Sequence, residues 1–389
     1  MKIISVSTSK FGVKNVVKNV LPRLSKKEIK CTFVSLPIYE KPMDCRKVSL
    51  LKKKPLNFFE KVQPFYLGYG IFYFWKKAYD YLKKKRENYD VIWLHNPRLL
   101  FLIPEKVKEK LLITFHGSLF FQRVNKYDFP ESLYYQIVGS IEQRGLKKVS
   151  ESRFTVVQEN IRKGLLEIGI DKNRISYIGN GVDLQRFSPS ENKDSLKKRL
   201  GIPEDDLVFL YLGRLARQKR PLTLIKFFSE IQERLEVKTS LLVAGKGPLE
   251  GRAKKYVERK NIENVNFLGF VDESKKPDLY AASDCFLLTS KWEGEPLTLY
   301  EALASGLPCI VPEIPELEYI DKKRWGKRID YSKMSSAASE VVEFLENNNR
   351  KIREEASREF AEKRLGWKNK VSKYQQILED IVTESGKSK

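Results

Sequence analysis

Short apolar runs separated by longer amphipathic stretches recur along the chain. In the first half these runs are rich in β-branched and aromatic residues and cover 3–7, 32–36, 91–94, 112–115 and 154–157. Runs of this kind are typical of parallel strands that are covered on both faces of a sheet. The segments between them are long enough for crossover helices, so the first half is predicted to alternate strands and helices.

The same alternation begins again after a polar break. Residues 192–204 are polar and charged and include Gly201-Ile202-Pro203, which favours an interdomain connection. Further apolar runs follow at 207–212, 240–244, 265–268, 285–288 and 309–311, with helices expected at 221–234 and 297–304. The predicted fold class is therefore α/β, with two doubly wound Rossmann-like domains facing across a cleft.

Composition limits the class of protein. A chain of 389 residues with 41% hydrophobic content is long and apolar enough to bury two cores. The longest uncharged stretch, 62–75, is shorter than the roughly 20 apolar residues that span a bilayer. The N-terminus resembles a first strand more than a signal peptide, so we expect a cytoplasmic protein, with peripheral attachment to the inner face of the cell membrane as an extension.

The cysteines fit the same compartment. Cys31, Cys45, Cys285 and Cys309 are widely spaced and form no metal-ligand pattern. Disulfides are rare in cytoplasmic proteins, so we expect all four side chains to be buried and inert.

Positive charge is concentrated in the first half. Of the formal net charge of +23, about +19 falls in residues 1–190 and about +4 in residues 191–389. This asymmetry indicates an anionic partner for the first half, such as nucleic acid, anionic lipid or a phosphorylated acceptor. A lysine-rich solubilising surface is the alternative.

Lysine clusters enclose an aromatic stretch within residues 52–86. Aromatic side chains flanked by Lys and Arg suit an element that lies among lipid headgroups. The alternative is a helix whose aromatic side chains pack on the sheet while its lysines stay in solvent.

The most specific chemical pattern lies at residues 293–306. Glu293 precedes a predicted helix that starts near Pro296 and Leu297, and Glu301 lies about one turn inside that helix. Free amides at a helix N-terminus suit a diphosphate or sugar hydroxyls. Two carboxylates placed in this way could contact opposite ends of one ligand. The alternative is an ordinary turn acid and a solvated helix residue.

Two further elements follow predicted strands. Arg214 and Lys219 come after the run 207–212, where fixed cations would hold a pyrophosphate and neutralise a phosphate leaving group. Surface cations are the alternative. Gly245 and Gly247 follow the run 240–244 and permit close backbone approach to a ligand, although a Gly-Pro turn explains them equally well.

These elements share an order and spacing with a known family. Together with Asn180-Gly181-Val182-Asp183 and Phe187, they resemble the retaining GT-B glycosyltransferases with a Glu-x7-Glu motif (glycosyl transferases group 1), which include bacterial mannosyl- and glucosyltransferases. The likeness runs from about residue 150 to 310. A helix expected at 367–382 resembles the family's last helix. The implied domains are 1–190 for the acceptor, 191–366 for the donor, and 367–389 as a helix packing back on the N-terminal domain.

The resemblance implies transfer of a hexose, with retention, from a nucleotide sugar (UDP-, GDP- or ADP-linked) to a glycan or lipid-linked acceptor. It implies no metal, no other cofactor and no nucleic-acid partner. Arg214 and Lys219 would bind the donor diphosphate, Glu301 the ribose, and Glu293 the transferred sugar. The implied catalytic residues are His116, Arg214, Lys219 and Glu293. The implied donor-binding residues are Gly12, Arg214, Lys219, Gly245, Phe270, Val271, Glu293, Gly294, Pro296, Leu297, Thr298 and Glu301.

The first half carries weaker signals. The chain has only two histidines, His95 and His116, and each follows a predicted strand. His116 resembles the family position whose imidazole meets the donor sugar or the reacting centre, and Gly12 lies in the loop where the family places glycines. The chain departs from the family at Glu295, where an aromatic residue is usual, and at 311–316, where a glycine-rich loop is usual.

Other functions remain open from the sequence. A nucleotide-sugar epimerase of the same fold would share the donor site but would act without an acceptor. A basic nucleic-acid-binding protein would explain the charge, although no recognised nucleic-acid-binding motif supports it. A non-catalytic sugar binder would not need Arg214, Lys219 and both glutamates.

Overall fold

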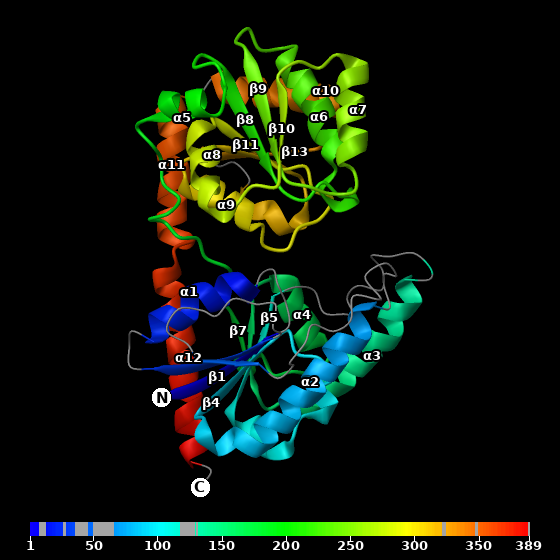
Figure 1. Cartoon of the computed structure of the whole chain (residues 1–389), viewed down its shortest axis with the longest axis vertical. Coiled ribbons are helices and arrows are strands. Elements are labelled where there is room, and N and C mark those ends of the chain that lie inside the picture. Colours follow the sequence, from blue (N-terminus) through cyan, green and yellow to red (C-terminus); the bar gives the residue numbers. More distant parts are fainter. Residues whose placement is uncertain are drawn as a thin grey trace. The chain divides into compact units, whose positions relative to one another are not determined.

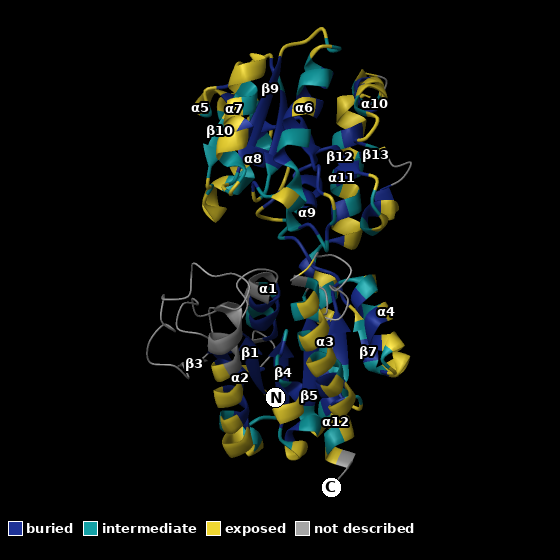
Figure 2. Ribbon diagram, turned by 90° about the vertical axis from the view of Figure 1, so that its right-hand side faces the viewer, coloured by how far each residue is buried: buried dark blue, intermediate teal, exposed yellow. Residues whose placement is uncertain are grey.

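The chain folds into two compact units. The computed structural model describes residues 1–7, 13–25, 29–35, 46–49, 66–116, 129, 131–320, 324–346 and 349–387. The first unit comprises Met1–Asn180 and Trp367–Lys389, and the second comprises Gly181–Gly366. Each unit is a parallel sheet with helices packed on its faces (Figure 1). In each, the central strands are buried and the outer faces of the helices are exposed (Figure 2).

The first sheet has the strand order β3-β2-β1-β4-β5-β6-β7, and all its pairings are parallel. Chain order reverses between β1 and β4, which makes this pair the topological switch point of the sheet. The strands are β1 (Lys2–Ser7), β2 (Lys30–Ser35), β3 (Arg46–Ser49), β4 (Val91–His95), β5 (Leu111–Phe115), β6 (Arg153–Val156) and β7 (Ile175–Tyr177).

Helices cover this sheet on both faces. The α-helices are α1 (Val13–Ser25), α2 (Tyr66–Lys85), α3 (Glu131–Lys148), α4 (Glu159–Glu167) and α12 (Trp367–Lys387). The 3-10 helices are η2 (Arg86–Asn88), η3 (Leu100–Leu102), η4 (Glu105–Lys110) and η6 (Lys172–Arg174).

The C-terminal helix α12 is part of the first unit because of its apolar face. Trp367, Val371, Tyr374 and Leu378 recur at helical spacing and are buried in one cluster with α1 and β4. The ring of Tyr374 lies 5.0 Å from that of Trp93 in β4.

Helix α2 carries the described part of the Lys-flanked aromatic segment. Phe74, Trp75 and Tyr79 are buried in the core beneath the helix, whereas Lys83–Lys85 are exposed. These side chains therefore follow the packing alternative, with aromatic residues on the core and lysines in solvent. Residues 52–65 lie outside the described part of the chain.

The second sheet has the order β10-β9-β8-β11-β12-β13, again with parallel pairings. Its switch point lies between β8 and β11. The strands are β8 (Leu207–Leu212), β9 (Thr239–Ala244), β10 (Val265–Gly269), β11 (Cys285–Leu287), β12 (Cys309–Pro312) and β13 (Gly326–Ile329). The α-helices are α5 (Lys193–Arg199), α6 (Pro221–Gln232), α7 (Glu250–Lys260), α8 (Lys276–Ala282), α9 (Leu297–Ala304), α10 (Met334–Glu346) and α11 (Arg350–Arg364), and the 3-10 helices are η7 (Arg217–Lys219), η8 (Glu273–Lys275) and η9 (Pro315–Ile320).

The expected interdomain connection at 192–204 is instead part of the second unit. It forms α5, and Lys197 is buried there, donating to the carbonyl oxygens of Glu204 (2.7 Å) and Asp206 (2.8 Å). The polar sequence was misleading because these charged side chains pair within the unit.

Arg358 of α11 attaches the segment before α5 to the end of α9. Its Nη1 donates to the carbonyl oxygens of Phe187 (2.8 Å) and Ala304 (2.7 Å), and its Nη2 donates to that of Leu184 (3.1 Å). One guanidinium thus satisfies carbonyls at a helix end, where intrahelical partners are lacking.

Three of the cysteines are as expected. Cys31, Cys285 and Cys309 are buried, and burial raises the pKa of the Cys285 and Cys309 thiols. Cys45 lies outside the described residues. Within the described ranges, no helix combines the length and apolar character needed to cross a membrane.

Candidate functional site

Two loops meet at the switch point of the second sheet. One follows β8 and the other follows β11. Thr289 Oγ1 donates to the carbonyl of Lys219 (2.8 Å), Gln218 Nε2 to that of Trp292 (2.9 Å), and the Lys291 amide to that of Gln218 (2.7 Å). These bonds fix the loops to each other, so the side chains they carry keep a defined spacing.

An ion pair joins the same loops. Lys219 Nζ pairs with Glu293 Oε1, and the Ser290 hydroxyl donates to that same oxygen. Glu293 is only 7% exposed. A buried carboxylate is tolerated when it is paired and hydrogen-bonded, which is the case here. The structure thus brings together two of the residues that the sequence singled out.

Arg214 lies at the start of the β8 loop. Its side chain is exposed and, among the described residues, has no hydrogen bond or ion pair. Its carbonyl accepts from Tyr211 Oη (3.3 Å). Burial, reinforced by Glu293, raises the pKa of Tyr211, so this phenol stays protonated and can donate. The guanidinium is left available for an anionic ligand.

Helix α9 begins at Leu297 after Pro296, and no side chain caps it. Its first intrahelical bonds run from the amides of Leu299 and Tyr300 to the Pro296 carbonyl. The amides of Leu297 and Thr298 therefore make none within the helix and form its positive end. Gly294 lies between Glu293 and this end and is partly exposed.

Glu301 is held from α8. Tyr280 Oη donates to its Oε2 (2.9 Å), and Lys276 Nζ lies 3.6 Å from its Oε1. Burial raises the pKa of the Glu301 carboxyl, and Lys276 and the Tyr280 hydrogen bond oppose that rise. Burial also raises the pKa of Tyr280, with Glu301 adding to it. The carboxylate is thus oriented, not freely solvated.

Gly245 approaches the protein's own backbone. Its φ is +138°, its amide donates to Gly269 O (2.6 Å), and a Cβ there would lie 1.9 Å from Gly213 O. A Cβ on Gly247 would lie 2.3 Å from Leu215 O. The glycines therefore let the loop after β9 support the loop that carries Arg214 and Lys219.

Two further predicted donor-binding residues, Phe270 and Val271, lie beside the edge strand β10. Phe270 follows this strand and is 70% exposed, whereas Val271 packs partly against the core. An exposed phenylalanine offers a flat apolar surface, which suits a nucleobase.

In the first unit, both histidines lie at the carboxyl ends of adjacent strands. His95 Nδ1 lies 2.9 Å from His116 Nε2, and His95 Nε2 lies 3.1 Å from Ser5 Oγ. Burial lowers the pKa of His116 to about 3, and burial together with His116 lowers that of His95 well below its usual value. Both rings are therefore neutral at neutral pH. Gly12 lies outside the described residues.

Sequence reasoning missed the groups that hold these residues. Ser290, Tyr280, Lys276 and Ser5 belong to no motif, and each acts through a tertiary contact. Only their places near strand ends or on the helix preceding β11 could have drawn notice.

Comparison with known proteins identifies the family. The model described as "Glycosyl transferases group 1" matches residues 192–363, and that described as "Glycosyltransferase Family 4" matches residues 12–186. The Escherichia coli protein named UDP-Gal:alpha-D-GlcNAc-diphosphoundecaprenol alpha-1,3-galactosyltransferase is 38% identical over 156 residues, which cover 38% of this chain and 39% of that one. Residues 192–363 belong to the group 1 glycosyltransferases, and residues 12–186 to glycosyltransferase family 4.

Solved structures show the fold of this glycosyltransferase family member. Sucrose-phosphate synthase from Thermosynechococcus elongatus matches 98% of this chain and 99% of its own, with a TM-score of 0.77 and 17% identity. Anabaena HepE in complex with UDP-glucose matches 98% and 100%, with a TM-score of 0.67 and 17% identity. The fold is GT-B, as the sequence predicted.

One departure from the family pattern has a structural account. In place of a glycine-rich loop, the chain continues from β12 into η9, where Leu317 and Ile320 pack into the core. Glu313 N donates to Ile329 O (2.9 Å), which ties this segment to β13. The segment is therefore part of the scaffold of the second unit.

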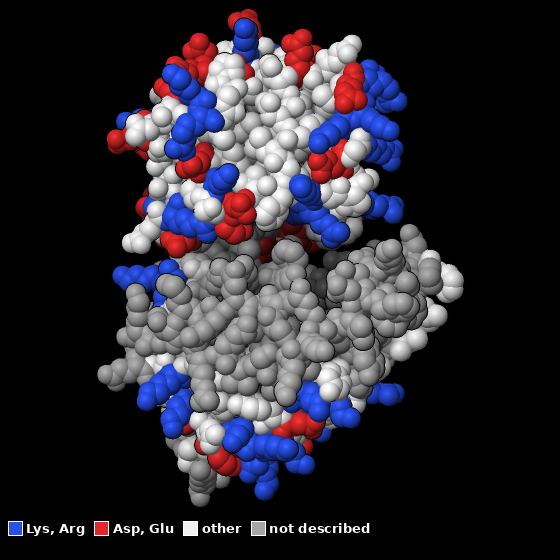
Figure 3. Space-filling model, in the orientation of Figure 1, with Lys and Arg blue, Asp and Glu red and all other residues white. Residues whose placement is uncertain are grey.

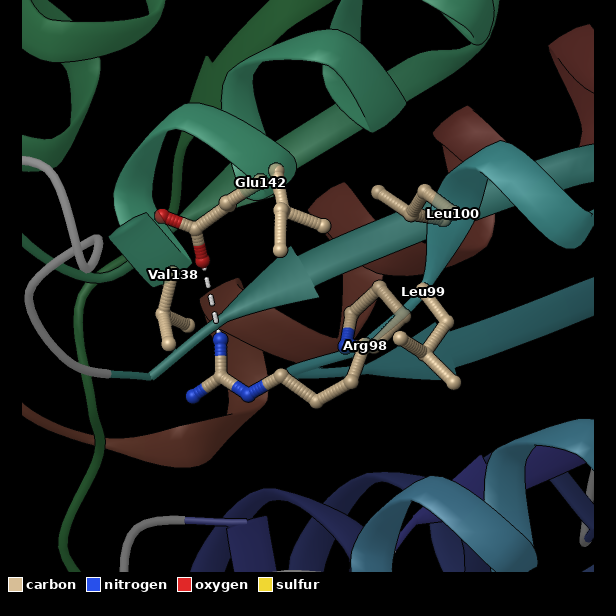
Figure 4. A pocket seen from close by; sticks show the side chains of 7 residues that line it. Arg98, Leu99, Leu100, Val138 and Glu142 are labelled. Carbon is tan, nitrogen blue, oxygen red and sulfur yellow. Dashed lines mark hydrogen bonds and ion pairs between the residues drawn. The ribbon is translucent and has the colours of Figure 1, made fainter. Parts of the chain in front are cut away.

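The structure also contains a small pocket in the first unit. Arg98 and Glu142 form an ion pair of 2.9 Å beside otherwise apolar side chains (Figure 4). The pocket is lined by Pro97, Arg98, Leu99, Leu100, Val138, Ile141 and Glu142. None of the site residues predicted from the sequence lines it.

Among the described residues, no group of three or more His, Cys, Asp or Glu could hold a metal ion.

The Gly245→Ala variant tests the support of the β8 loop. We expect a loss of about 3 kcal/mol or more in the free energy of unfolding, since the new Cβ meets Gly213 O at a positive φ. Gly251→Ala in α7 is the control, because its Cβ meets nothing within 4 Å and should be neutral or slightly stabilising. Equal denaturation midpoints for the two variants would contradict this account.

The histidine pair predicts a pH dependence of stability. Unfolded histidines take up protons near pH 6.5, whereas folded His116 does so only near 3. Acidification across this window therefore favours the unfolded chain, by up to about 1.4 kcal/mol per pH unit for each imidazole. The stability advantage of the wild type over the His95→Gln/His116→Gln double variant should shrink as pH falls from 7 to 3. Both proteins have the same carboxylates, so the carboxylates do not change the difference between them. A difference in the free energy of unfolding by urea that stays constant from pH 7 to pH 3 would refute the prediction.

Proposed function

We propose that the chain transfers a hexose, with retention, from a nucleotide-sugar donor to a glycan or lipid-linked acceptor. The observation that carries this proposal is the Lys219–Glu293 pair at the switch point of the second sheet, with exposed Arg214 on the same loop as Lys219. Open α/β sheets bind ligands at this point. Two cations beside a helix N-terminus suit a diphosphate.

The donor diphosphate lies against Arg214 and Lys219 in this proposal. Lys219 exchanges part of its pairing with Glu293 for a phosphate oxygen, which frees Glu293 and the α9 amides for sugar hydroxyls. Glu301, oriented by Tyr280 and Lys276, accepts from the ribose hydroxyls. Phe270 and Val271 flank the base. The UDP-glucose named with HepE and the UDP-Gal named for the Escherichia coli relative support a nucleotide-sugar donor.

The reaction breaks the bond between the anomeric carbon and the phosphate oxygen. Negative charge grows on the departing phosphate, and Arg214 and Lys219 stabilise it. The acceptor hydroxyl attacks the same face, and the departing phosphate takes its proton. The new bond therefore keeps the anomeric configuration. No metal is required for these steps, because the two cations supply the charge.

A lipid-linked acceptor is supported by two observations. The Escherichia coli relative is named for an acceptor on diphosphoundecaprenol. The described part of α2 also keeps Lys83–Lys85 exposed, whereas over the second unit basic and acidic side chains are interspersed (Figure 3). Exposed lysines favour a surface of anionic headgroups, and Lys83–Lys85 outnumber the exposed Asp80 and Glu87 that flank them.

A donor panel tests the proposal first. We expect one among UDP-, GDP- and ADP-sugars to stabilise the folded protein by about 2.7 kcal/mol at a hundredfold excess over Kd. This stabilisation is measured as a rise in the thermal midpoint. Glu301→Ala should abolish the shift, whereas the exposed Glu355→Ala of α11 should retain it. If no nucleotide sugar stabilises the wild type, the proposal fails.

Turnover tests the role of Lys219. With the donor found in the panel, Lys219→Ala should lower kcat by about a hundredfold or more, since it removes charge stabilisation of the departing phosphate. The exposed Lys260→Ala at the end of α7 is the matched control. An unchanged kcat in the Lys219 variant would rule out this role.

A further inference from the structure

A chain of side-chain contacts crosses the switch point of the first sheet. Ser5 lies in β1, His95 ends β4, and His116 follows β5, which are adjacent strands. Ser5 Oγ lies 3.1 Å from His95 Nε2, and His95 Nδ1 lies 2.9 Å from His116 Nε2. This series of contacts ends at His116 Nδ1, a buried nitrogen without a hydrogen-bond partner in the described structure.

The two rings are held in place from several sides. Asn96 Oδ1 accepts from the His116 amide (2.8 Å), and the Asn96 amide donates to Thr114 O (2.8 Å). The ring of Trp93 lies 4.8 Å from that of His95. Because the rings are fixed, which nitrogen of His116 carries the proton depends on His95 and Ser5.

Counting hydrogens distinguishes the two tautomers. Burial keeps both imidazoles neutral, so each carries one N–H and a single hydrogen lies between the rings. Ser5 is fully buried, and among the described residues its hydroxyl contacts only His95 Nε2. If His95 Nε2 carried the hydrogen, the Ser5 hydrogen would lack an acceptor and His116 Nδ1 would lack a donor.

The opposite arrangement leaves fewer groups unsatisfied. Ser5 donates to His95 Nε2, His95 Nδ1–H donates to His116 Nε2, and the remaining hydrogen is on His116 Nδ1. Only that N–H then lacks a partner, and a buried unpaired donor is costly until a ligand accepts from it.

We propose that Ser5 and His95 are positioning residues that hold His116 as its Nδ1–H tautomer, so that this N–H donates to an oxygen of the bound substrate. The tautomer is a property of the ligand-free chain. The contact between His116 and the substrate, unlike the tautomer, rests on the proposed function. A neutral donor of this kind orients a hydroxyl or phosphate oxygen without adding charge.

Nitrogen NMR of the ligand-free, histidine-labelled protein tests the tautomer. Two histidines give two sets of signals, and His95→Gln assigns them. We expect His116 to show a protonated Nδ1 and an unprotonated Nε2. A protonated Nε2 on His116 in the wild type would overturn the proposal. Because this arm uses no substrate, it is independent of the proposed function.

A matched pair at Ser5 tests the positioning role. Ser5→Val and Ser5→Thr have nearly the same shape, but only Thr keeps the hydroxyl. Ser5→Val should mix the two tautomers and lower kcat/KM about tenfold with the donor from the panel. Ser5→Thr should keep the single Nδ1–H tautomer and the wild-type kcat/KM. Equal spectra and equal kcat/KM for the pair would overturn the proposal. If the spectra show Nδ1–H but no nucleotide sugar binds, the proposed function fails and the tautomer chain stands.

Discussion

The pairing of Lys219 with Glu293 is the interaction on which the second unit's site depends. A carboxylate exposed by only 7% would be costly alone, and here one ammonium and the Ser290 hydroxyl satisfy the same oxygen. Both partners lie on loops, and a loop has no backbone hydrogen-bond ladder, such as that of a β-sheet, to fix its position. The hydrogen bonds that the Thr289 and Gln218 side chains donate to carbonyls of the opposite loop therefore decide whether the pair can form.

Rigidity in these loops comes from glycine and from neighbouring strands. Gly245 has no Cβ, so the loop after β9 can lie against Gly213 and hold the backbone next to Arg214. On the other side, Arg358 bonds the carbonyl of Ala304 and fixes the far end of α9. The positive end of α9 is thus held in one orientation, which a helix of its length would not keep unaided.

The sequence predicted the central strands of both sheets and the edge strand β10, but it missed the other three edge strands. The missed strands are β3, β7 and β13, each at the end of its strand order. Edge strands are short and polar, as in Gly326–Ile329, and carry little of the apolar signal of a buried strand. Similarly, the motif gave Arg214, Lys219, Glu293 and Glu301, and the structure pairs two of them. It could not give Ser290 or Tyr280, since their roles come from contacts across the fold.

The two switch points use different physics. At the second sheet a charged pair can exchange partners, and in the proposed function a phosphate oxygen competes with Glu293 for Lys219 through electrostatic attraction. At the first sheet the histidines are neutral, and their hydrogens are directed by a fully buried serine. A neutral N–H directs a hydrogen bond toward a hydroxyl without the attraction for anions that a fixed cation has. Each switch point is thus held by contacts within its own unit, by an ion pair in the second unit and by neutral hydrogen bonds in the first.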